Sequence, residues 1–290
     1  MNPEHEGVYE ITSIGRPLDP AYPTNRAVLG LLPLAAVVAG GLAAGGGAGV
    51  VGVLARAAGG ALAVFGSWAL AREIAPDDEI AGAFLAPALG FVAYLTLEAA
   101  LVPLFAALFF ARVVARTTGL AATGLDSLFV TALALFAAWR AGSPWPASVG
   151  AVAFALDAVF ASGGARQWLF TGLCAAGAVA LTSAGLAPDI VPVQPALVPR
   201  IAGTVVVVGV IALIAATHSV SARGDATGQP LSAARVRGAQ AVTLLTALAT
   251  AASGSAGVEA GALVWATLAA VVVTTAWRGL TPGTAGSRSG

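Results

Sequence analysis

The chain has 290 residues, of which 58% are hydrophobic and only 10% are charged, and its mean hydropathy is +0.88. Soluble domains usually have about a quarter of their residues charged. This composition excludes a soluble globular protein and predicts one that is surrounded by a lipid bilayer. The net charge is zero, so nothing indicates a nucleic-acid partner.

The first 26 residues are polar and carry Glu4, Glu6, Glu10 and Asp19. They lack the order of a cleavable signal peptide, in which a charged segment is followed by a short apolar one. We therefore expect residues 1–26 to form a polar cytoplasmic tail. Residues 27–278 are expected to form a transmembrane helical bundle, and residues 279–290 a short flexible tail.

Long apolar runs follow the N-terminal tail, and a transmembrane helix needs roughly 20 such residues. The runs are continuously apolar rather than alternating, which favours helices over a barrel. Short separators rich in Gly, Pro and Ser divide them. The expected spans are residues 27–44, 50–71, 120–139, 147–163, 167–186, 201–218, 237–255 and 258–277.

Residues 80–115 are too long for one ordinary span and barely long enough for two, and the arginines help to decide between these readings. Cytoplasmic loops are enriched in basic residues. If the segment turns near Thr96-Leu97-Glu98, eleven arginines fall on one side of the membrane. The other side then has only Arg56, Arg140 and Arg200. This bias favours about ten spans in the cell membrane with both termini cytoplasmic, and nine spans remain the alternative.

Charged residues inside a span are costly and are functional candidates by default. Four qualify here: Arg56, Glu98, Asp126 and Asp157. In the ten-span topology both aspartates approach the cytoplasmic end of the bundle, where they could form a site for a proton, a cation or a charged head group. The alternative is structural: Asp126 would cap the start of a helix and Asp157 would pair with an arginine.

The densest charged segment runs from Arg72 to Glu79 and includes Asp77 and Asp78. Adjacent carboxylates on a cytoplasmic loop can hold Mg²⁺ bridged to a diphosphate. In length, helical character and an acidic loop after the second span, the chain resembles membrane prenyltransferases of the UbiA type. That resemblance implies a prenyl-diphosphate-using enzyme with Mg²⁺ as its cofactor. The chain departs from the family pattern, because no Asn stands beside Asp77 and no second Asp-x-x-x-Asp loop follows.

Arg116 and Arg166 lie on the expected cytoplasmic loops and complete the candidate loop site with Arg72, Asp77, Asp78 and Glu79. Apart from the Mg²⁺ of the enzyme reading, we expect no cofactor and no metal site. Cys174 is the single cysteine, and neither histidine has partners at metal-ligand spacing. The sequence contains no phosphate-binding loop, nucleophile elbow or zinc-protease motif.

Three functions therefore stay open. Many spans, short loops and intramembrane carboxylates favour a permease for a small solute or ion. The acidic loop alone favours an enzyme that acts on a lipid or prenyl substrate. The third is a non-catalytic membrane subunit, which would bind a partner or a further copy through helix faces rich in small residues.

Overall fold

The computed structural model describes residues 6–97, 99–161, 164–185 and 197–280. Every regular element in these ranges is a helix, which confirms the expected all-α fold class. The helices are α1 (Glu6–Ile11), α2 (Pro23–Gly45), α3 (Val50–Ile74), η2 (Ala81–Leu85), α4 (Ala86–Thr96), α5 (Leu101–Ala115), α6 (Gly124–Ala141), α7 (Trp145–Phe160), α8 (Ala165–Ser183), α9 (Leu197–Ala216), α10 (Ala233–Ala251), α11 (Gly254–Ala260) and α12 (Ala262–Leu280).

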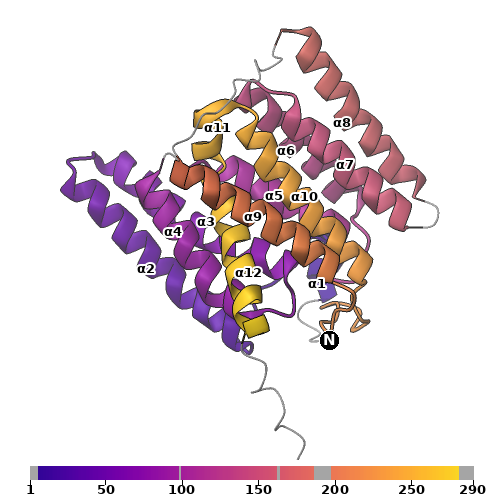
Figure 1. Cartoon of the computed structure of the whole chain (residues 1–290), viewed down its shortest axis with the longest axis horizontal. Coiled ribbons are helices and arrows are strands. Elements are labelled where there is room, and N and C mark those ends of the chain that lie inside the picture. The colour runs from indigo at the N-terminus through magenta and orange to yellow at the C-terminus, as the bar shows by residue number, and fades with distance from the viewer. Residues whose placement is uncertain (1–5, 98, 162–163, 186–196, 281–290) are drawn as a thin grey trace, which may run out of the picture.

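The helices form one bundle in which α2 and α8 lie at opposite edges (Figure 1). Some helices that follow each other along the chain pack side by side, as α2 does on α3 and α7 on α8. Helix α5 lies at the centre and contacts α3, α6, α7, α10 and α12. The start of the described chain at α1 and the end of α12 lie at the same end of the bundle (Figure 1). We call this the polar end, because the buried charges gather there.

Four helices are long and apolar enough to cross a membrane: α2, α3, α6 and α12. The apolar helices Ala81–Thr96, Leu101–Ala115, Trp145–Phe160 and Ile201–Ala216 are shorter than 18 residues. Polar residues such as Arg235 and Gln240 lie in α10. Helix length and composition support a helical membrane protein, but they do not by themselves confirm about ten spans.

The segment that was ambiguous in sequence forms two helices. After η2, which is π-helical, α4 ends at Thr96, and α5 begins at Leu101. The backbone is extended at Leu97 and at Ala100, so the helix cannot continue across this point. The predicted break near Thr96-Leu97-Glu98 is therefore confirmed, while Glu98 itself lies outside the described residues.

Large apolar side chains cover the outside of the bundle. Leu34 and Val37 on α2, Val51 on α3 and Leu169 on α8 are each more than half exposed. Val205, Val208 and Ile211 on α9 are exposed in the same way. Contiguous apolar surface of this extent is unusual on soluble monomers and is what the hydrocarbon of a bilayer contacts.

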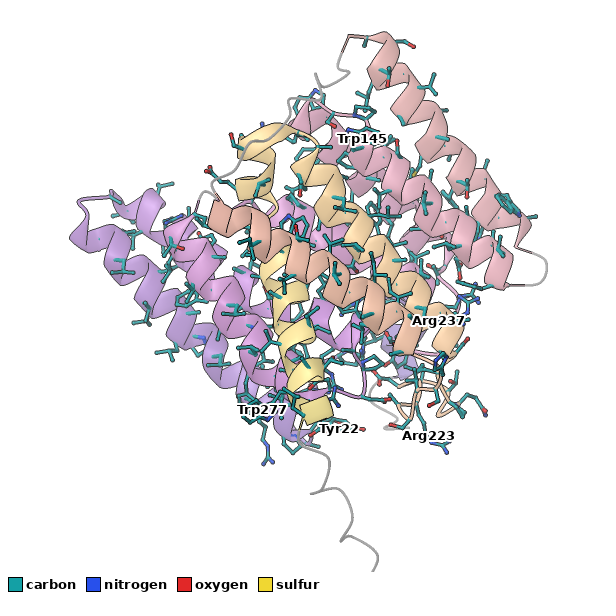
Figure 2. All side chains as sticks on the ribbon, viewed as in Figure 1. Tyr22, Trp145, Arg223, Arg237 and Trp277 are labelled. Atoms are coloured by element: carbon teal, nitrogen blue, oxygen red, sulfur yellow. The ribbon has the colours of Figure 1, made fainter. Side chains whose placement is uncertain are left out.

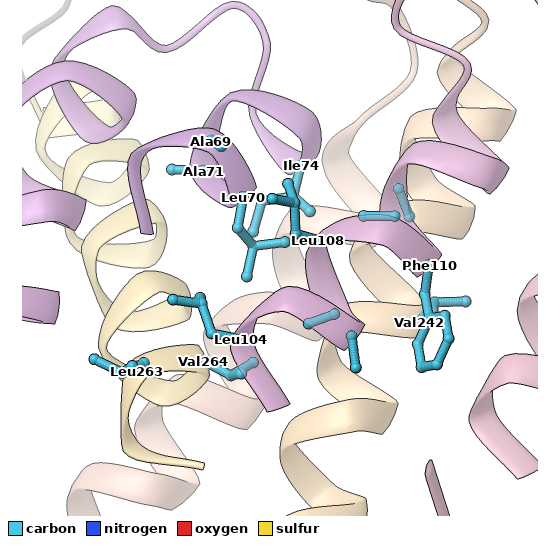
Figure 3. Packing of buried hydrophobic residues seen from close by; sticks show 14 of the residues in the cluster. Ala69, Leu70, Ala71, Ile74, Leu104, Leu108, Phe110, Val242, Leu263 and Val264 are labelled. Atoms are coloured by element: carbon cyan, nitrogen blue, oxygen red, sulfur yellow. The ribbon is translucent and has the colours of Figure 1, made fainter. Parts of the chain in front are cut away.

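Small residues let neighbouring helices approach the central helix α5. A Cβ on Gly66 of α3 would lie 2.6 Å from Leu104, and one on Gly238 of α10 would lie 2.8 Å from Val114. A Cβ on Gly150 of α7 would lie 3.3 Å from Phe110. Phe110 and its neighbours on α5 fill the interior beside Val242 of α10 (Figure 3). Close packing through small residues is a main source of helix association in membranes.

We predict that Gly150→Val lowers the unfolding temperature, while Gly172→Val has little effect. A side chain at Gly150 would meet Ala134 at 2.9 Å, whereas nothing lies within 4 Å of the corresponding position at Gly172. Overpacking of a filled interior costs about 1–3 kcal/mol. The reaction of buried Cys174 with a fluorogenic thiol dye during heating in detergent would report unfolding. Equal midpoints for the two variants would contradict this account of the packing.

Candidate functional site

The buried charges in the described ranges lie near the polar end, where α3, α5, α7 and α12 end and α6, α8 and α10 begin. They are Glu73, Asp78, Arg112, Asp126 and Asp157. Figure 2 shows Tyr22, Arg223 and Arg237 at this end and Trp145 at the other. An unpaired charge is costly in a low dielectric medium, so the partners of each residue decide whether it is structural or free to bind a ligand.

Glu73, in the last turn of α3, is fully buried and accepts from three side chains. Arg112 Nε of α5 donates to its Oε1 at 3.0 Å, and Arg16 contacts the same oxygen at 3.3 Å. Thr117 donates to the other oxygen. Arg112 also donates to the carbonyl of Ile14 at 2.9 Å. The Glu73 cluster therefore fastens the N-terminal segment to α3 and α5.

Asp157, in the last turn of α7, accepts four hydrogen bonds from three side chains. Arg116 donates to both carboxylate oxygens, at 2.7 and 2.9 Å, and Arg235 of α10 donates to one of them at 2.7 Å. Gln167 of α8 donates at 2.8 Å. Arg116 stands in the left-handed region with φ of 50°, where it caps the end of α5. The predicted pairing of Asp157 with an arginine is confirmed, with two arginines rather than one.

Asp126 forms a capping box with Thr123 at the start of α6. Its carboxylate also accepts from the Thr12 hydroxyl at 2.6 Å and from the backbone N–H and hydroxyl of Ser13 at 2.9 Å. The structural alternative for Asp126 is therefore the one the geometry matches. The carboxylate holds the N-terminal segment against α6 and lines neither of the two pockets described below.

The acidic loop after α3 does not form one carboxylate cluster. Asp78 is buried, accepts from the N–H groups of Ile80 and Ala81, and contacts Thr274 and Arg278 of α12. Asp77 instead accepts from Ser221 and from the N–H of Ala222 in the loop before α10. Glu79 is exposed.

The remaining predicted site residues lie apart from these clusters. Arg56 is exposed near the other end of α3, with its guanidinium 4.9 Å from the ring centre of Tyr94. Arg166 donates to the carbonyl of Ala122. Within the described ranges no three His, Cys, Asp or Glu side chains are placed to hold a metal ion.

A pocket of about 500 Å³ opens at the polar end, and we call it the arginine pocket. Its walls come from the N-terminal segment, α3, α5 and the loop before α10. The charged residues that line it are Arg16, Asp19, Arg72, Glu73, Arg112, Arg223 and Asp225. Of the candidates predicted from sequence, only Arg72 lines this pocket.

Two groups outside the spans keep their protons in this pocket at neutral pH. Burial alone would lower the pKa of the Arg16 guanidinium, but the charges of Glu73 and Asp225 raise the pKa above its ordinary value. Burial and the nearby Asp225 raise the pKa of the Tyr9 phenol. Arg16 therefore stays cationic and Tyr9 stays a hydrogen-bond donor.

A second pocket, of about 310 Å³, lies at the opposite end of the bundle. We call it the apolar pocket, because its lining from α5, α6, α7, α10 and α11 is mostly alanine, valine and proline, with Arg140 as the charged member. Pro103 and Ala106 of α5 border this pocket, whereas Arg112 of the same helix borders the arginine pocket.

Comparisons with protein-family models, with curated proteins and with solved structures found no match to this chain.

Sequence reasoning missed Glu73, Arg112 and Trp68 as members of the site. Glu73 belongs to the charged segment Arg72–Glu79, and Arg112 begins the expected loop after residues 80–111; charges are ordinary in such loops. Nothing in the sequence relates residues 39 positions apart. One signal was available: both residues belong to expected loops on the same side of the membrane.

We predict that Glu73→Gln destabilises the protein far more than Asp225→Asn, although both carboxylates pair with Arg16. The Glu73 side chain is 0% exposed and that of Asp225 is 37% exposed. Loss of the Glu73 charge leaves Arg112 buried without its counter-ion, which costs about 3–5 kcal/mol. An exposed pair contributes at most about 1 kcal/mol. The thermal midpoint from Cys174 labelling measures both, and similar losses would contradict the central role of Glu73.

Proposed function

We propose that the chain crosses the membrane ten times, with both termini in the cytoplasm. The crossings are α2, α3, η2 with α4, α5, α6, α7, α8, α9, α10 and α12. Successive helices in this series run in opposite directions through the bundle (Figure 1), and most of the arginine-bearing ends lie at the polar end. Both features support this count, because cytoplasmic ends are enriched in arginine. The shorter helices pair with longer ones, and local thinning of the bilayer accommodates spans of unequal length.

We further propose that the protein is a permease for a small solute. The observation that carries this proposal is a pair of pockets at opposite ends of the bundle, both bordered by α5. Binding sites near the middle of a membrane protein that are reached in turn from each side are the general design of transporters. Here the two pockets are the two entrances.

An apolar partition separates the pockets. Leu104 and Leu108 of α5 pack there with Leu70 and Ile74 of α3 and with Leu263 of α12 (Figure 3). All five are fully buried. A permease with this partition would be closed, and transport would require α5 to move relative to α3 and α12.

The carboxylates first considered for transport do not support this proposal, since Asp126 and Asp157 are saturated with donors and line neither pocket. The enzyme alternative needs Asp77 and Asp78 to converge with a further carboxylate, and they bind separate partners instead. A non-catalytic subunit needs no pocket at all and is the remaining alternative.

The ten-crossing topology predicts opposite accessibility for Ala48, in the turn after α2, and Gln229, in the loop before α10. Both residues are exposed. In a Cys174→Ala background, Ala48→Cys should react with an impermeant thiol reagent only from outside the cell, and Gln229→Cys only from the cytoplasm. Reaction of both from one side would contradict this topology.

The permease proposal predicts that the partition opens transiently to water. Ala107 of α5 is fully buried between the two pockets. Ala107→Cys, in the Cys174→Ala background, should react slowly with a charged methanethiosulfonate reagent in both right-side-out and inside-out vesicles. Native Cys174, which is equally buried and lines neither pocket, is the matched control and should stay unreactive.

Reaction of Ala107→Cys from one side only would reveal a blind pocket rather than a pathway. No reaction from either side would mean a static partition, and the non-transporting subunit would then be the better interpretation.

A further inference from the structure

The arginine pocket contains a guanidinium that has no direct partner. Arg72, on α3, lines the pocket and makes no hydrogen bond or ion pair with any residue in the described ranges. By contrast, Arg16 and Arg112 are both held by Glu73. The charge of Arg16 acts against the positive charge of Arg72, while Asp225, Glu73 and Glu79 favour it without contacting it. A negative ligand beside Arg72 would offset the repulsion by Arg16.

The backbone opposite Arg72 is shaped to hold its side chain. A Cβ on Gly82 would lie 2.7 Å from Cδ and 3.0 Å from Cγ of Arg72, so only glycine leaves room for the stem. Gly82 belongs to the π-helical segment η2. Such segments are rare and are frequent at functional sites. The position of Arg72 is therefore fixed by packing, although its charged group is free.

The wall of the same pocket contains a tryptophan whose buried donor is unpaired. Trp68 is 7% exposed and lines the pocket, and its indole Nε1 has no hydrogen-bond partner. A buried tryptophan N–H normally finds an acceptor, because leaving it unmet costs free energy. Phe65, whose ring centre is 6.0 Å from that of Trp68, lines the pocket beside it. One wall thus combines an aromatic surface with an unmet donor.

We infer that the arginine pocket binds an oxyanion, a carboxylate or phosphate carried by a small organic molecule or by a lipid head group. Arg72 is its donor, and the aromatic wall of Phe65 and Trp68 contacts its apolar part. The pocket lining has four arginines and three carboxylates, which leaves one positive charge for the ligand to neutralise. Its volume of about 500 Å³ lies in the range of small-molecule sites.

This inference deepens the proposed permease function, since it names the substrate class of the cytoplasmic entrance. It can nevertheless be tested by binding alone. If the wild type binds oxyanions but Ala107→Cys does not react, the oxyanion site stands and the permease proposal fails. If Ala107→Cys reacts but no oxyanion binds, the permease proposal stands and the oxyanion site fails.

The test measures binding of the full-length protein to inorganic phosphate and to benzoate in detergent by titration calorimetry. A parallel arm compares the thermal midpoint in nanodiscs of phosphatidylcholine with and without phosphatidylglycerol. Four variants are compared with the wild type: Arg72→Gln, Trp68→Phe, Gly82→Ala and the control Arg237→Gln. Arg237 is exposed at the same end of the bundle but outside the pocket (Figure 2).

We expect Arg72→Gln to weaken binding about tenfold or more, because a charge-assisted hydrogen bond is lost. Trp68→Phe should weaken it by a smaller factor, and Gly82→Ala should weaken it by displacing Arg72. Arg237→Gln should stay near the wild-type value. The Cys174 unfolding midpoint identifies any variant that fails to fold, and Gly82→Ala then tests the site with Arg72 itself intact.

Binding of phosphate or benzoate with this pattern would identify a free anion as the ligand. A phosphatidylglycerol effect alone, lost in Arg72→Gln, would identify a lipid head group at the same site. Absence of both effects in the wild type would overturn the inference. An equal loss in Arg237→Gln would also overturn it, because the binding would then follow net charge rather than the pocket.

Discussion

A charge inside a low-dielectric bundle must be neutralised where it stands, and the whole polar end of this protein depends on that requirement. Each buried carboxylate receives several donors: three side chains make three hydrogen bonds to Glu73, and three side chains make four to Asp157. A partner charge and full hydrogen bonding offset the free-energy cost of desolvating a buried charge. When one partner is removed, the remaining charge stays buried and that cost is no longer offset. Because the donors come from many helices, satisfying the carboxylates also sets how the helix ends and the connecting loops are placed.

Elsewhere in the bundle the packing depends on small side chains rather than on large ones. Glycines on α3, α7 and α10 face α5, which allows a helix of 15 residues to occupy the centre with Leu104, Leu108 and Phe110 fully enclosed. The same arrangement produces the partition between the two pockets. A partition that consists of side chains from three helices, without a hydrogen bond across it, can separate when the helices shift.

Hydropathy located most helices within a few residues of their bounds, because a membrane demands long apolar runs whatever the fold. The arginine distribution correctly favoured two helices within residues 80–115. The cap at Asp126 was readable, since Thr123 stands three residues before it. The Glu73 cluster and the role of Trp68 could not be predicted from the sequence, because they depend on which helices become neighbours. Hydropathy gives the depth of a residue in the membrane but not its lateral contacts.

The contacts of the polar end join parts of the chain that are synthesised far apart in time. Arg16 pairs with Asp225, 209 residues later, and Asp78 contacts Thr274 and Arg278 on α12. Until α12 has packed into the bundle, Asp78 lacks these side-chain partners. A chain without α12 would therefore keep an incompletely neutralised carboxylate after α3. The polar end can therefore close around Asp78 only after α12 has packed against the loop that follows α3.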